Sequence, residues 1–172
     1  MRIGGVDRLA LLAEIQKHGI ELNQAGLQLF ATDRFTTAEA PSILETVEIT
    51  VAGLGFARGA TIADICERAV QLALCPCPLE LGPHLRLQYL DQPEGHIGHP
   101  PSRHRAPPGS LTIASAPIAD DDIPKGFYLR RIDGVLWLRG YRSGPEHVWS
   151  PEDHFVFAVS PGRLHAPPAE RR

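Results

Sequence analysis

The first part of the chain carries apolar side chains at helical spacing, interrupted by residues that cap helices. Asp7 can cap a first helix, which ends at Gly19 because glycine tolerates the positive φ of a C-terminal cap. Asn23 can cap a second, shorter helix that ends near Phe30. The pattern therefore predicts two consecutive helices within the first thirty residues.

The clearest helical pattern follows Gly59. Thr61 and Asp64 have the spacing of a capping box, in which each side chain bonds the backbone of the other. The residues after Thr61 form one continuous apolar face, made by Ile62, Ile65, Cys66, Ala69, Leu72 and Ala73. This helix must end before Pro76.

Two segments, 43–54 and 84–90, fit a helix or a strand. In 43–54, Ser42 and Glu45 can form a capping box, and apolar residues recur at helical spacing, but Val47, Ile49 and Val51 also alternate with polar residues. We expect a helix because the cap and the stripe agree. Segment 84–90 follows Gly82-Pro83 and stays open between a short helix and a strand.

The second half of the chain reads as β-structure. We expect strands over 111–118, 127–132, 135–141 and 155–159. Asp133-Gly134 is the dipeptide that most strongly indicates a two-residue hairpin turn, so the second and third of these strands should pair across it.

These elements predict an α+β fold with a helical N-terminal half packed on a C-terminal antiparallel β-meander. We expect a single domain over 1–160, with a helical part at 6–90 and a β part at 110–160. Segment 91–109, which is rich in proline and histidine and has Ile97 as its only large aliphatic residue, is expected to be a flexible insert. Residues 161–172 are expected to form a flexible tail.

Composition narrows the class of protein. The chain has 172 residues, of which 43% are hydrophobic, and no run approaches the roughly 18 apolar residues of a membrane helix. We therefore expect no membrane partner. The three cysteines are an odd number, which predicts a reducing cytoplasm. Arginine far outnumbers lysine, a bias typical of GC-rich bacterial genomes. The net charge of −3 gives no overall attraction to nucleic acid.

Three stretches together resemble a family of small, uncharacterised bacterial proteins: KHGIELNQAGLQLF (Lys17 to Phe30), CPLELGPHLRLQYLDQPEG (Cys77 to Gly95) and VWSPEDHFVF (Val148 to Phe157). Some members carry an automatically assigned helicase label. The resemblance implies no activity, cofactor or site residue. A helicase motor needs a Gly-Lys-Ser/Thr phosphate loop, and neither Lys17 nor Lys125 stands in one. We therefore expect no helicase activity.

The hairpin offers the one candidate binding surface with a defined geometry. A two-residue turn sets Arg130 opposite Trp137 and Tyr128 opposite Arg139, all on one face, with Leu129 and Leu138 among the residues on the other. Arginines beside aromatic rings can hold phosphates and stack on bases. The simpler interpretation, which we favour, is that they cover the sheet through cation–π contacts.

The sequence also contains candidate metal ligands and candidate acid–base residues. Cys66, Cys75, Cys77 and His84 form one candidate metal set, although Cys-x-Cys is too tight for the usual zinc knuckle; His96, His99 and His104 form another. Acid–base candidates are Asp120, Asp121 and Asp122 and the pairs Glu146-His147 and Asp153-His154. None has the spacing of a known site, so we expect no cofactor and no catalytic residue.

The function stays open at this level. The interpretation we favour is a cytoplasmic binding or interaction module without catalytic activity, with a protein as one partner class. The first alternative is a nucleic-acid-associated protein that uses the hairpin face or a winged-helix-like half, with 78–90 as the recognition helix. The second is a small metal-dependent or hydrolytic enzyme.

Overall fold

The computed structural model describes residues 1–95, 106–116 and 123–160. Within these ranges the helices are α1 (Arg8–Lys17), α2 (Gln24–Ala31), α3 (Ile62–Gln71) and α4 (Leu81–Gln88). Asp7 caps α1, Asn23 caps α2, and Thr61 and Asp64 form the capping box of α3, as predicted. Segment 84–90, left open above, is largely helical as the second part of α4. None of the described helices has the length and apolar character needed to cross a membrane.

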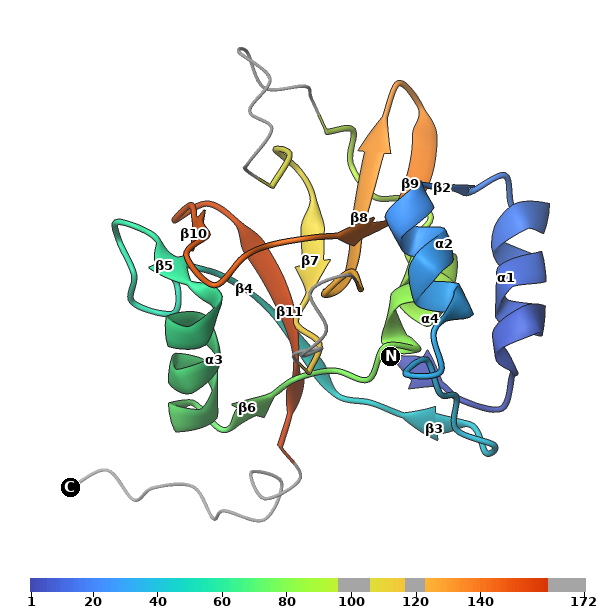
Figure 1. The fold of residues 1–172 in the computed structure, drawn as a ribbon, viewed down its shortest axis with the longest axis horizontal. Helices are drawn as coiled ribbons and strands as arrows, with labels where there is room; N and C mark the ends of the chain where they lie inside the picture. Colours follow the sequence, from blue (N-terminus) through green and yellow to red (C-terminus); the bar gives the residue numbers. More distant parts are fainter. Residues whose placement is uncertain (96–105, 117–122, 161–172) are drawn as a thin grey trace.

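A seven-stranded mixed sheet forms the centre of the molecule (Figure 1). Its strands run in the order β2 (Glu21–Leu22), β9 (Val135–Tyr141), β8 (Gly126–Ile132), β7 (Leu111–Ile113), β11 (His154–Val159) and β4 (Thr46–Thr50), and β6 (Leu74–Cys75) also pairs with β11. Two small sheets pair β1 (Arg2–Ile3) with β3 (Ser42–Ile43) and β5 (Ala60–Thr61) with β10 (Val148–Trp149).

The chain is a mixed α/β structure, but its sheet is not the simple C-terminal meander expected above. Strands β2, β4 and β6 come from the N-terminal half, and the pairs β2–β9 and β7–β11 are parallel. The last strand, β11, lies in the interior between β7 and β4. Its run of buried residues from Phe155 to Ala158 is typical of a strand covered on both faces.

The helix expected over 43–54 is wrong, and the strand alternative is observed. Ser42 pairs with Ile3 in the small sheet, so it does not cap a helix. Residues 46–50 pair antiparallel with β11, with Val47 opposite Phe157 and Ile49 opposite Phe155. The β-branched residues gain more by packing on these rings than the isolated capping signal offers. Tertiary contacts therefore decide this segment.

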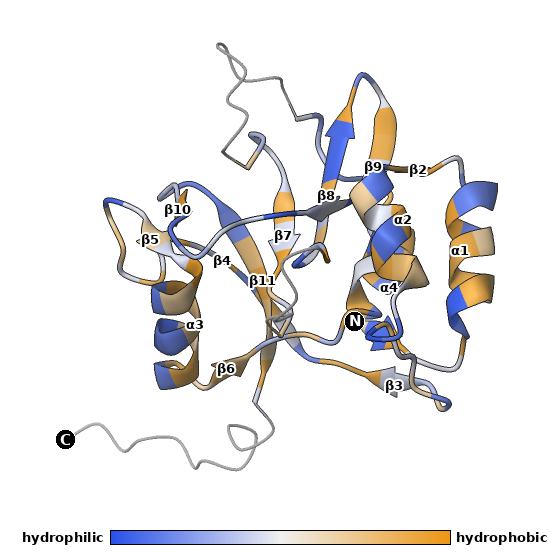
Figure 2. Cartoon of the chain, in the orientation of Figure 1, coloured by the Kyte–Doolittle hydropathy of each residue, from blue (hydrophilic) through white to orange (hydrophobic). Residues whose placement is uncertain are grey.

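Two apolar clusters lie on opposite faces of the sheet. On one face, α2 and α4 contact β8 and β9, and α1 packs on α4; their cluster includes Leu129, Leu138 and Val156. On the other, α3 and the β5–β10 pair cover Phe155 and Phe157 (Figures 1 and 2). In α3 the buried positions are Ile65 and Ala69, whereas Leu72, assigned above to the apolar face, is the half-buried C-cap. Successive side chains along a strand point to opposite faces of the sheet and thus join alternate clusters.

The two ends of the segment 91–109 are packed against the hairpin. Gln92 is 2% exposed, and its amide donates to the carbonyl oxygens of Gly109 and Leu129. The backbone of Gly95 donates to Arg131 O at 2.8 Å. Residues 96–105 and 161–172, where most of the expected insert and the whole expected tail fall, lie outside the described residues.

Candidate anion-binding cleft

An open cleft of about 640 Å³ lies on the face of the sheet that carries α3, over strands β7, β8 and β9. Thr112, Tyr128, Arg130 and Arg139 line it from the strands. The connection from β9 to β10 crosses in front of β7 (Figure 1) and contributes residues 142–144, 146 and 147 as a wall. α3 packs on the β11–β4 half of this face, and no helix of the described ranges covers the β7–β9 half.

The hairpin presents its polar residues to this cleft through its register. Asp133 and Gly134 take the positive φ angles of 51° and 75° that a type I′ turn requires. The predicted cross-strand pairs are observed, with Arg130 opposite Trp137 and Tyr128 opposite Arg139. Leu129 and Leu138 are fully buried on the other face, as predicted. The alternation therefore directs both arginines and Tyr128 to the open face.

Arg130 and Arg139 line the cleft without a hydrogen-bond or ion-pair partner within the described ranges. The Nε atom of each is buried without a hydrogen-bond partner there. Arg131 Nε also lacks a hydrogen-bond partner there, but it forms an ion pair with Glu94 at 3.3 Å. Arg68 donates to Leu54 O at 3.0 Å. Arg130 and Arg139 are diagonal neighbours across β8 and β9, a relation that places Cα atoms roughly 7–8 Å apart. Two like charges are thus held close together.

Trp137, the fourth residue of the predicted surface, lies beside the cleft and does not line it. The Arg139 guanidinium lies over its ring, 4.9 Å from the centroid. The observed cation–π contact therefore joins Trp137 to its neighbour two residues along the strand, and not to Arg130 across the hairpin. Arg139 touches both the cleft and the Trp137 ring.

Aromatic residues form the inner wall of the cleft. The rings of Tyr141 and Trp149 meet edge to face with centroids 5.6 Å apart, and His147 meets Trp149 in the same way at 4.9 Å. Trp149 is 4% exposed, and its Nε1 donor has no partner among the described residues. Burial raises the pKa of Tyr141, so its phenol stays protonated at neutral pH. This wall offers rings and neutral donors.

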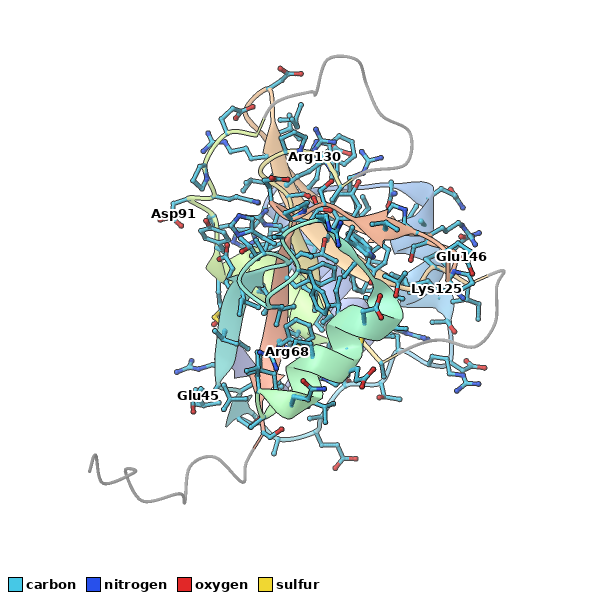
Figure 3. The ribbon with its side chains drawn as sticks, turned by 90° about the vertical axis from the view of Figure 1, so that its left-hand side faces the viewer. Glu45, Arg68, Asp91, Lys125, Arg130 and Glu146 are labelled. Atoms are coloured by element: carbon cyan, nitrogen blue, oxygen red, sulfur yellow. The ribbon has the colours of Figure 1, made fainter. Side chains whose placement is uncertain are left out.

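The charges that line the cleft are mainly positive, although the chain as a whole is acidic. Among the described residues, Arg130, Arg139 and Arg142 line it together with one carboxylate, that of the exposed Glu146. Arg142 also donates to Gln28 Oε1 of α2 at 2.6 Å. Figure 3 shows that Arg130, on the hairpin, lies away from Arg68 on α3. The overall charge of −3 thus conceals a local cationic surface.

Sequence reasoning identified Tyr128, Arg130 and Arg139 but missed Thr112, Tyr141 and Trp149. Thr112 reaches the site because β7 pairs with β8, where it stands opposite Tyr128. Trp149 reaches it because β10 pairs with β5, the strand that leads directly into α3. Both placements depend on pairing between distant segments, for which no local signal exists. The alternation of Tyr141 with Arg139 was the one signal available.

The candidate metal set does not come together in the structure. Cys75 Sγ donates to Ala158 O and Cys77 Sγ to Val156 O, whereas Cys66 lies on α3 and His84 on α4. Burial raises the pKa of Cys77 to about 12 and also raises that of Cys66. Across the three described ranges, no group of three His, Cys, Asp or Glu side chains could hold a metal ion. His96, His99 and His104 lie outside those ranges.

The acid–base candidates are equally dispersed where they can be placed. Asp153 accepts from the backbone of Ser150 at 2.7 Å and so stabilises a turn, whereas His154 pairs with Glu48 at 2.7 Å. Glu146 is exposed, while His147 packs on Trp149. Asp120, Asp121 and Asp122 lie outside the described residues.

The winged-helix alternative fails at its recognition helix. Residues Leu81 to Arg86 of α4 are all buried, and Arg86 is 0% exposed. His84 accepts a hydrogen bond from the backbone of Gly4 at 3.1 Å. A recognition helix must expose its polar side chains to the groove, so α4 cannot read DNA in this fold.

Comparison with protein-family models, with curated proteins and with solved structures finds no match to this chain. The function is therefore argued from the cleft and its residues.

Proposed function

We propose that this protein is a non-catalytic binding module that holds an anionic group of its ligand between Arg130 and Arg139. The observation that carries the proposal is the pair of guanidinium groups that line a cleft without a carboxylate partner in the described part of the chain. The three cysteines are free thiols, which supports a reducing compartment such as the cytoplasm.

Two adjacent, partly desolvated arginines repel each other unless an anion lies between them. The planar guanidinium group presents donors in a fork that matches carboxylate and phosphate oxygens. Binding of an anion therefore removes the repulsion and satisfies donors at the same time. This double gain distinguishes the pair from Arg131, whose charge Glu94 already balances.

Binding is a better account of the cleft than turnover. Its arginine, tyrosine and tryptophan side chains are hydrogen-bond donors that can hold an anion. General acid–base catalysis needs a group that gains and loses a proton near neutral pH, and the histidine that lines the cleft, His147, packs edge to face on the Trp149 ring. The groups identified here can hold and orient an anion without changing it.

Pyrophosphate is a suitable probe, measured by isothermal titration calorimetry with the purified full chain. We expect Arg130→Gln and Arg139→Gln each to weaken binding by about tenfold or more, as for the loss of a hydrogen bond from a charged group. Arg34→Gln, which removes the same charge from an exposed position outside the cleft, is the matched control and should bind as the wild type does. Equal binding by all four proteins, or none by the wild type, would contradict the proposal.

A further inference from the structure

We propose, building on the anion-binding function above, that the ligand is a nucleoside phosphate, free or as a unit of a single strand. Its phosphate would lie between Arg130 and Arg139, and its base would lie against the aromatic wall of the cleft. Three features of the cleft lead to this ligand class: its size, its rings, and the position of Trp137 just outside it.

The size of the cleft excludes a lone inorganic anion as its full occupant. Its volume of about 640 Å³ falls within the range of roughly 300–1,000 Å³ that is typical of sites for organic ligands. A single water molecule accounts for about 30 Å³ of liquid volume, and a phosphate ion has only five heavy atoms. Most of the cleft is therefore available for an organic group attached to the anion.

The rings make a flat aromatic group a suitable choice for that part of the ligand. Tyr128 and Tyr141 are half-buried and line the cleft, Tyr128 opposite Arg139 across the hairpin and Tyr141 two residues after Arg139 along β9. Stacking on tyrosine accepts any base, because every base presents a π-face. The unpartnered Nε1 donor of the buried Trp149, at the inner wall, is available to a base or sugar oxygen after a small shift of its surroundings.

Trp137 indicates how a longer ligand would continue. The Arg139 guanidinium lines the cleft and also covers the Trp137 ring at 4.9 Å, so phosphate and ring positions follow each other along β9. A free nucleotide fills the cleft without reaching Trp137. A second nucleotide of a strand would pass Arg139 and meet that ring. Trp137 therefore distinguishes the two sources of the same chemistry.

Glu146 places a negative charge at the cleft, which would repel a bound phosphate. Its exposed carboxylate lines the cleft and makes no ion pair within the described residues. A carboxylate near a bound phosphate weakens binding, so Glu146→Gln is expected to bind nucleotides several-fold more tightly. This variant leaves both arginines and all the rings in place.

The test compares inorganic phosphate, AMP, UMP and labelled six-nucleotide single-stranded RNA and DNA, all with the wild-type chain, by calorimetry or fluorescence anisotropy at two salt concentrations. We expect each mononucleotide to bind at least tenfold more tightly than phosphate. Tyr128→Ala should weaken mononucleotide binding more than it weakens phosphate binding, and so reduce this preference. Trp137→Ala should weaken only the oligonucleotides if strands are the source, and nothing if free nucleotides are.

The outcomes separate this inference from the proposed function. Mononucleotides and oligonucleotides that bind no more tightly than phosphate, with the arginines still required, would overturn the nucleoside phosphate and leave the anion site standing. The same holds if a phosphotyrosine peptide binds and nucleotides do not. Loss of all anion binding, including that of pyrophosphate, would overturn both. Because the wild-type comparison needs no variant, a variant that misfolds does not affect the decision.

Discussion

At the scale of single residues, the hydrogen-bond partners around an arginine indicate its role in this fold. Arg86 is 0% exposed, and burial lowers its pKa to about 10. Its guanidinium donates to Gln92 and to the backbone of Tyr89, so its role is structural. Arg130, with the same side chain, lines a cleft and lacks such partners in the described residues. The surroundings of an arginine, and not its identity, separate a core group from a candidate ligand-binding group.

His84 makes a prediction about pH at the same scale. Burial holds its pKa below the usual value, against the opposing effect of the Glu80 carboxylate 3.8 Å away. The ring nitrogen that faces Glu80 also accepts a hydrogen bond from Gly4, which protonation would remove. In the unfolded chain this histidine titrates near pH ~6.5. The unfolded state therefore takes up the proton first, and stability falls as the pH drops below that value.

The measurement is the free energy of urea unfolding at several pH values between 8 and 5. His84→Gln keeps an acceptor for Gly4 but does not titrate, so the variant should lose less stability on acidification than the wild type. Other histidines contribute equally to both proteins and cancel in the difference. Parallel pH profiles would show that His84 does not titrate in this way.

At the scale of elements, local signals predicted well and long-range pairing did not. Helices α1, α2 and α3 and the β8–β9 hairpin have caps or turn residues within a few positions, and all four were predicted. The placement of β4 beside β11 and of β11 beside β7 depends on contacts between residues that are far apart in sequence. The candidate site follows the same division. The hairpin register gave Tyr128, Arg130 and Arg139, whereas the wall from Tyr141 to Trp149 required the fold.

The cap of α2 illustrates how one residue serves two elements. Asn23 Oδ1 accepts from Gly26 N and from Gly140 N, both at 2.8 Å, and its amide donates to Gly140 O at 3.0 Å. A Cβ on Gly140 would lie 2.5 Å from the Ala25 carbonyl carbon, so α2 packs directly on the backbone of β9. Asn23 therefore caps the helix and fixes it to the sheet.

We expect Asn23→Ala to cost clearly more stability than a cap alone. Losing the cap costs about 0.5–2 kcal/mol, and leaving buried groups of Gly140 without partners adds about 1–3 kcal/mol. Asp7→Ala is the matched control, because Asp7 caps α1 through a single bond to Ala10 N and is exposed. Chemical denaturation measures both. Equal losses would mean that the bonds to Gly140 contribute nothing.

Two deletions test the boundaries of the segment between α4 and β7. Deleting 92–108 removes Gln92, the acceptor for the buried Arg86 guanidinium, and should cost about 2–3 kcal/mol for that bond alone. Replacing 96–105 with two glycines keeps Gln92. The composition of the replaced segment predicts little loss of stability. The ends already lie together, since a Cβ on Gly109 would lie 3.0 Å from Gly95 Cα. Similar melting temperatures for the two deletions would contradict this boundary.

At the scale of the whole molecule, one sheet joins two apolar clusters, and this arrangement bears on whether residues 1–160 behave as a single domain. Neighbouring positions on β11 alternate between the clusters, with Val156 and Ala158 in one and Phe155 and Phe157 in the other. Loss of the helices on one face would therefore expose the same strands whose other side chains form the cluster on the opposite face. We therefore predict one cooperative unfolding transition rather than two.

The two tryptophans allow this to be tested, because Trp149 lies in the cluster covered by α3 whereas α1, α2 and α4 cover the other face. In a Trp137→Phe background, Trp149 fluorescence reports one face and far-ultraviolet circular dichroism reports mainly the helices of the other. The two urea transitions should coincide. Phe127→Leu, a change in the opposite cluster that should cost on the order of 1 kcal/mol, should shift both transitions by the same amount. A shift in the dichroism alone would show that the faces unfold separately, because a single cooperative unit must transmit a loss of packing on one face to the tryptophan on the other.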